Sequence, residues 1–286
     1  WQELFGTGIV KTTEDFGIVG SAPSNQELLD WLAVDFREHG WDLKRFYKQV
    51  ISSATYRQAA VITSEKLEKD RDNALLSRGP RFRMDAEMIR DYALAASGTL
   101  SPRMGGPGTY PYQPENIWEV VGMHNMSYKQ DTGENLYRRT VYNFWKRMAA
   151  PASLDIFNAP SREMSCVRRD RTNTPLQALV TLNDPQYVEA SRILAQHTLQ
   201  QPGDDAGRLN AAATRLLCRP LKAEELPILT DSLTQLRKHY STNAADAEAL
   251  LKVGESKSDP KLPKSELAAW TMVCSQLLNL DEVLNK

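Results

Sequence analysis

The residues best suited to chemistry in this 286-residue chain lie in one short charged segment. It contains four arginines and two acidic residues, namely Arg162, Arg168, Arg169, Arg171, Glu163 and Asp170. Guanidinium groups bind carboxylates, phosphates and sulfates through paired hydrogen bonds. A helix is expected to begin at Thr174, and the free N–H groups and positive dipole end of such a start favour anions. The pattern therefore indicates a binding site for an anionic group.

A second interpretation assigns the same arginines to an internal salt-bridge network. Its acidic partners would be Asp85, Glu87, Asp91 and Asp170. Such pairs hold a loop in one geometry even where they add little net stability. We favour this network, which would fix a junction between the middle of the chain and its C-terminal helices, and we keep the anion site as the alternative.

Cys166 lies in the same segment and is one of three cysteines. Arg168 and Arg169 follow it closely, and nearby cations favour the reactive thiolate. A reactive thiol is thus one interpretation, while a buried small hydrophobe is the one we favour. The odd count excludes a fully paired disulfide framework.

The sequence contains no complete metal or nucleophile motif. The four histidines are far apart along the chain, at His39, His124, His197 and His239. No Cys-x-x-Cys, His-x-x-x-His or Gly-x-Ser-x-Gly occurs. We therefore expect no metal and no attached haem in this chain, and no catalytic residue can be assigned.

The elements that would position these residues are mostly helices. Capping boxes are predicted at Ser24–Glu27 and Thr174–Gln177, and further helix starts at Asp42, Asp85 and Asp184. A core-facing stripe follows the first box at Leu28, Leu32 and Phe36. Leu176, Leu179, Val180 and Leu182 predict that the helix after Thr174 is largely buried.

Two regions depart from this helical pattern. Residues 99–132 are rich in Pro and Gly and predict a long irregular loop. Residues 136–145 are β-branched and aromatic enough for a strand. Residues 65–91 hold seven basic and seven acidic residues, which we interpret mainly as a solvated face with surface ion pairs.

The expected fold is mainly α, an irregular multi-helix bundle with a small β element near residues 136–145. We expect a single helical domain over 1–286, with a subdivision at 1–160 and 161–286 as an alternative. A composition of 41% hydrophobic and 25% charged residues is that of a folded globular chain. The formal net charge of −1 argues against a nucleic-acid partner, and no apolar run is long enough to span a membrane.

Several long motifs resemble the planctomycete-type domain of unknown function found C-terminal to cytochrome-c-like domains in very large bacterial proteins. The matching stretches are Trp1–Val10, Asp15–Gly17, Glu27–Ala33, Ser53–Gln58, Arg81–Glu87, Thr174–Leu179, Leu182–Pro185 and Leu277–Glu282. In that family an Asp often follows the residue matching Phe157, whereas Asn158 stands here. This departure weakens any proposal of a catalytic carboxylate at that position.

The resemblance implies the C-terminal part of a multidomain, exported protein, periplasmic or at the cell surface, whose c-type haem lies in an upstream domain. It implies no settled activity. We therefore expect a non-catalytic scaffold or interaction domain whose partners are other domains of the same chain, or a protein or polysaccharide. The alternative is a hydrolase or binding protein for an anionic substrate that uses the arginines at 162–171.

Overall fold

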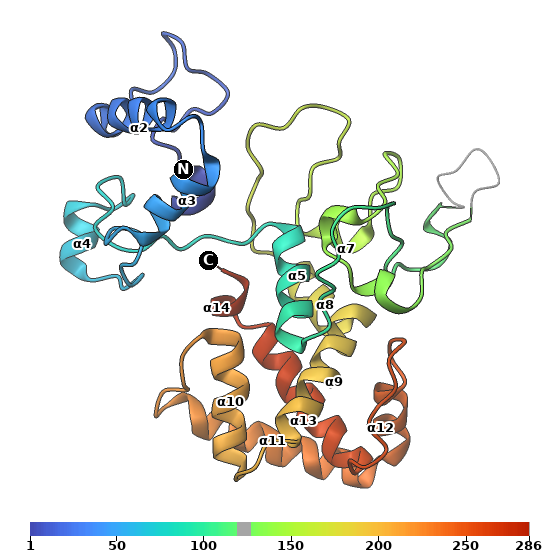
Figure 1. Cartoon of the computed structure of the whole chain (residues 1–286). Helices are drawn as coiled ribbons and strands as arrows, with labels where there is room; N and C mark the ends of the chain where they lie inside the picture. Colours follow the sequence, from blue (N-terminus) through green and yellow to red (C-terminus); the bar gives the residue numbers. More distant parts are fainter. Residues whose placement is uncertain (119–126, 286) are drawn as a thin grey trace. The chain divides into compact units, whose positions relative to one another are not determined.

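A computed structural model describes residues 1–118 and 127–285 and confirms a mainly helical fold (Figure 1). Within these residues the chain forms thirteen α-helices and no sheet. The helices are α1 (Gln2–Phe5), α2 (Gln26–Glu38), α3 (Leu43–Ser52), α4 (Ser64–Lys69), α5 (Ala86–Ser97), α7 (Ala152–Ile156), α8 (Pro175–Asn183), α9 (Pro185–Leu199), α10 (Asp205–Leu217), α11 (Glu225–Thr242), α12 (Ala244–Leu251), α13 (Lys264–Leu278) and α14 (Asp281–Leu284).

The chain separates into two compact units. Unit 1 comprises residues 1–82 and 166–168, and unit 2 comprises residues 83–165 and 169–285. The main division therefore follows Phe82, whereas the subdivision considered from the sequence lies near residue 160. Folding of the whole chain as one domain stays a prediction.

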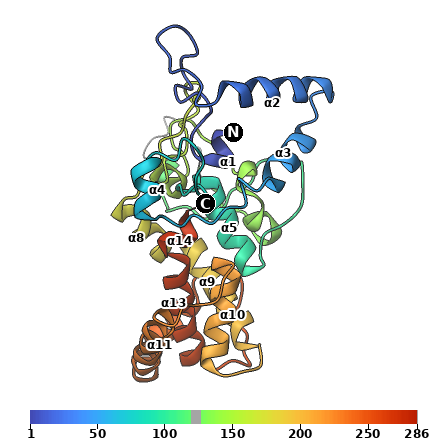
Figure 2. The ribbon, with the colours of Figure 1, turned by 90° about the vertical axis from the view of Figure 1, so that its left-hand side faces the viewer.

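In unit 1, α2 and α3 are joined by a short connection at Gly40, which has a left-handed backbone (φ +66°). Figure 2 shows α3 folding back steeply beneath α2. Asp42 caps α3 as predicted, because its carboxylate accepts a hydrogen bond from the Arg45 amide at 3.0 Å. The cap of α2 lies one residue later than predicted. Its acceptor is the Asn25 side chain, 2.9 Å from the Leu28 amide, so Ser24 does not form the expected capping box.

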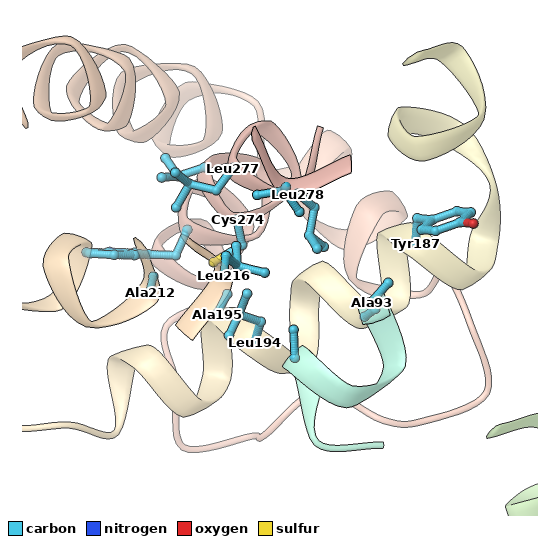
Figure 3. Packing of buried hydrophobic residues seen from close by; sticks show 14 of the residues in the cluster. Ala93, Tyr187, Leu194, Ala195, Ala212, Leu216, Cys274, Leu277 and Leu278 are labelled. Carbon is cyan, nitrogen blue, oxygen red and sulfur yellow. The ribbon is translucent and has the colours of Figure 1, made fainter. Parts of the chain in front are cut away.

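The core of unit 2 is built around α13, which packs against α9 and α11. Trp270, Cys274 and Leu277 of α13 are fully buried, as their spacing of three and four residues predicts. Figure 3 shows Cys274 beside Leu216 of α10 and Ala195 of α9. A continuous apolar interior thus holds the C-terminal helices together.

Arg90 on α5 is a fully buried cation in the same unit, only 1% exposed. Its Nε donates to the Gln186 side chain at 2.6 Å. Its two terminal nitrogens donate to the carbonyls of Arg138 and Leu136, each at 2.7 Å. One side chain therefore joins α5, the beginning of α9 and residues 136–138.

These bonds account for the conformation of residues 136–145. Two 3-10 helices, Gly133–Tyr137 and Thr140–Tyr142, occupy half of the region. Its β character is limited to isolated bridges at Arg138 and Asn143, so the continuous strand expected there does not form. Arg90 takes the carbonyls of Leu136 and Arg138, which a strand would offer to a neighbouring strand.

Part of the charged stretch at residues 65–91 also differs from the sequence interpretation. Its buried members are Asp70, Arg78, Arg83 and Arg90, each 9% exposed or less. For these four, a solvated face is the wrong description. Their polar atoms bond to loops and neighbouring side chains, contacts that a local charge count does not reveal.

We expect Arg90→Met to destabilise unit 2 by about 3 kcal/mol, because it leaves two buried carbonyls without donors. Urea unfolding followed by circular dichroism measures this loss. Arg139→Met is the matched control, since the Arg139 side chain is 47% exposed and its Nε lies 3.9 Å from Asp91. If both variants stay within about 0.5 kcal/mol of the native chain, the role given to Arg90 is wrong.

Candidate functional site

Two arginines of the charged segment meet acidic residues at the start of α5. Arg169 Nη1 lies 2.6 Å from Glu87 Oε2 and 3.9 Å from Asp85 Oδ2. Arg171 Nε lies 3.4 Å from Asp85 Oδ1. Asp85 is the N-cap residue of α5 and Glu87 lies in its first turn, where carboxylates are favoured by the helix dipole. These four side chains form a compact ion-pair cluster within unit 2.

The other two arginines have different surroundings. Arg162 lies over the ring of Trp145, with its guanidinium carbon 4.7 Å from the ring centroid. Arg168 belongs to unit 1, where its Nε lies 3.8 Å from Glu14 Oε1. Both partners in that contact are more than half exposed, so water screens it strongly. The neighbours of the four arginines therefore differ: Arg169 and Arg171 contact acidic residues at the start of α5, Arg162 contacts an aromatic ring, and Arg168 contacts an exposed glutamate in unit 1.

Asp91 and Asp170 are the other two acidic residues that the sequence offered as partners. Asp91 accepts hydrogen bonds from the amide and hydroxyl of Thr140, at 2.7 and 2.6 Å. It also lies 3.7 Å from Arg90 Nη1, so it supports the 3-10 region rather than the charged segment. Asp170 is exposed.

Thr174 is the N-cap residue of α8, but its side chain makes no capping bond. The predicted capping box is wrong because Gln177 is buried and points inward. The Gln177 side chain donates to the Ile156 carbonyl at 3.1 Å and accepts from Arg83 Nη2 at 3.2 Å. With this face inward, Leu176 and Leu179 are 60% and 54% exposed. The prediction that they are buried is therefore wrong as well.

Cys166 is exposed, which overturns the interpretation of a buried small hydrophobe. Its thiol donates to the Arg168 carbonyl at 3.0 Å. Cys218 is also exposed, whereas Cys274 is buried. Burial raises the pKa of the Cys274 thiol to about 12, so that this cysteine stays protonated and inert at neutral pH.

A buried polar cluster around Glu189 is not apparent from the sequence. The Glu189 carboxylate accepts from the hydroxyls of Tyr112 and Tyr137, at 2.9 and 3.1 Å. It also accepts from the amide and hydroxyl of Ser256, both at 2.6 Å. Arg192 Nη2 lies 3.6 Å from Glu189 Oε1. Burial, followed by the Glu189 charge, raises the pKa of Tyr137 to about 12.

The Glu189 cluster is best described as structural. Glu189 is 1% exposed and its carboxylate already accepts four hydrogen bonds, so little acceptor capacity is left for a ligand. A Cβ added at Gly254 would lie 2.4 Å from the carboxyl carbon of Glu189. The loop thus depends on glycine at this position. No local pattern predicts the cluster, because its members come from distant parts of the chain.

Metal-binding clusters and membrane-spanning helices are two further features that bear on function. No group of three or more His, Cys, Asp or Glu side chains in residues 1–118 and 127–285 is arranged to hold a metal ion. None of the helices in those residues combines the length and apolar character that a bilayer crossing requires. His124 lies outside the described residues.

The structure is therefore that of a mainly helical protein, in which the arginines of the 162–171 segment contact side chains of the same chain. Residues 1–233 match the family model PSD1, described as a protein of unknown function (DUF1553). Because the match covers most of the chain, the chain belongs to this family. No curated protein and no solved structure matches it.

We expect two thiols of the folded protein to react quickly with an aromatic disulfide reagent at pH 8, and all three to react in denaturant. The physical reason is the exposure of Cys166 and Cys218 and the burial of Cys274. The absorbance of the aromatic thiolate that the reagent releases gives the number of cysteines that have reacted. Cys166→Ser should lower the fast count by one and Cys274→Ser should leave it unchanged; a fast phase that disappears in Cys274→Ser would contradict the burial.

Proposed function

We propose that this chain is a non-catalytic scaffold or interaction domain of an exported, cytochrome-linked multidomain protein. The observation that carries the proposal is the pairing of Arg169 and Arg171 with Asp85 and Glu87. These arginines would bind the anion in a catalytic interpretation, and their charges are already balanced inside unit 2. They are better suited to holding the junction before α8 in one geometry.

The interaction surface that we propose is the exposed side of α8. Leu176 and Leu179 are three residues apart, so they lie on one face of the helix. Both are more than half exposed, although leucine side chains of this size gain about 1.5–3 kcal/mol from full burial. Covering them with another protein surface would be favourable. We propose that another domain of the same protein provides that surface, with a separate protein or a polysaccharide as the other candidates.

The cytochrome link and the extracytoplasmic location are supported by the motif resemblance described above. In this proposal the c-type haem belongs to an upstream domain, and the present chain contributes no cofactor. The nearly equal numbers of basic and acidic residues, 35 and 36, support a partner other than nucleic acid.

The alternative, a hydrolase or binding protein for an anionic substrate, needs arginines that are free to meet that substrate. Arg168, with its side chain 53% exposed, is the member of the segment that suits it best. Turnover of any substrate that disappears in Arg168→Ala or Arg169→Ala would overturn the scaffold proposal.

We expect the amides of residues 178–183 to exchange with deuterium at least about tenfold more slowly in the full-length protein than in this chain alone. When another domain covers α8, the helix unfolds locally less often. Slow exchange of its amides measures how rarely it does so. Hydrogen exchange followed by mass spectrometry measures the difference. The double variant Leu176→Glu, Leu179→Glu should abolish it while changing stability by about 0.5 kcal/mol or less.

Ile228→Glu is the matched control. Ile228 is 68% exposed on α11, and its substitution should leave the protection of α8 unchanged. Equal exchange of α8 in the two proteins would mean that no other domain covers this face.

A further inference from the structure

A pocket of about 250 Å³ in unit 1 has a cationic lining that the proposed function does not use. Three arginines line it, Arg71, Arg78 and Arg81, together with a single acidic residue, Asp72. Arg71 and Arg78 alone bring two positive charges to this lining, against the one negative charge of Asp72. Such a pocket attracts anions rather than cations.

Arg78 gives this lining an unusual buried charge. It is 9% exposed, and its guanidinium donates to the carbonyls of Asp70 and Arg71, both at 2.8 Å. These partners are neutral. In residues 1–118 and 127–285, no carboxylate lies within ion-pair distance of Arg78. A buried cation without a counter-charge is costly, and an anion in the pocket would offset that cost.

The loop that carries Arg78 is held in place before any ligand arrives. The Asp70 carboxylate accepts from the amides of Leu75 and Ser77, both at 3.2 Å. The Asn73 side chain donates to the Arg78 carbonyl at 3.0 Å and accepts from the Arg78 amide at 3.2 Å. Because backbone and side chain of Arg78 are both fixed, binding would require little ordering of the protein.

A larger pocket of about 370 Å³ continues from the cationic one. The two share Phe5, Thr7, Asp72 and Asn73 in their linings. The larger pocket adds apolar and aromatic side chains, among them Trp1 and Leu76. The Trp1 and Phe5 rings are stacked with centroids 4.3 Å apart. Together the two pockets offer a charged end and an apolar end.

We propose that this double pocket binds an organic oxyanion, with the carboxylate, phosphate or sulfate group toward Arg71 and Arg78 and the apolar part along Phe5 and Trp1. Guanidinium groups match the geometry of all three oxyanions. The site lies wholly within unit 1 and does not rest on the function proposed above. Its arginines are also different from those of the 162–171 segment.

Isothermal titration calorimetry of the whole chain at constant ionic strength, with chloride as the background anion, tests the site. The probes are phosphate, phenyl phosphate and benzoate. We expect saturable binding at one site, with phenyl phosphate at least about tenfold tighter than phosphate because its ring is removed from water. Tight binding of benzoate would identify the preferred group as a carboxylate. If phenyl phosphate binds and benzoate does not, the preferred group is a tetrahedral oxyanion.

Arg71→Glu is the decisive variant, because its exposed side chain can change without removing the carbonyl that Arg78 uses. We expect it to weaken phenyl phosphate binding by at least about tenfold while the circular dichroism spectrum stays native. Arg37→Glu is the control, since Arg37 is exposed on α2 and lines neither pocket. Absence of saturable binding for every probe, or equal affinity in Arg71→Glu and the native chain, would overturn the proposal.

Discussion

The irregular middle of unit 2 is organised around a buried cation, Arg90. Its guanidinium lies where the apolar core meets the irregular middle of the chain, and it donates to two backbone carbonyls and one amide side chain. A buried guanidinium needs several acceptors in fixed positions. The segment around Leu136 and Arg138 provides them only in its observed conformation. The need of the Arg90 guanidinium for acceptors thus fixes the backbone of residues 136–138, which have little regular structure of their own.

The same helix also fixes the segment after residue 168. Asp85 and Glu87 at the start of α5 hold Arg171 and Arg169, while Arg90 and Asp91 one turn later hold residues 136–140. The polar side of α5 is therefore a joint between two irregular segments and the helical core. These contacts account for many of the charges near α5.

Local chemistry predicts part of this fold well. The caps at Asp42 and Asp184 depend on a few neighbouring residues, and both have the expected geometry. Two predictions that depend on distant partners fail. The strand at 136–145 is replaced because Arg90 takes its carbonyls, and the helix after Thr174 presents the opposite face because Gln177 bonds to Ile156 and Arg83.

Charge density along the sequence also does not show which cations have acidic partners. The 162–171 segment is conspicuous in the sequence, yet Arg169 and Arg171 have acidic partners nearby. Arg78 lies in a stretch whose charges balance, and it is buried beside a pocket, where its guanidinium donates to two backbone carbonyls. Net charge along a sequence does not report which cation is paired in space.

The central claim is that the arginines before α8 stabilise the protein's own structure. A double-mutant cycle with Arg169→Ala and Glu87→Ala, followed by urea unfolding, tests it most directly. The account predicts a favourable coupling of about 0.5–1 kcal/mol between the two side chains, as for a partly exposed ion pair at 2.6 Å. No measurable coupling, together with loss of a ligand or an activity in Arg169→Ala alone, would contradict it.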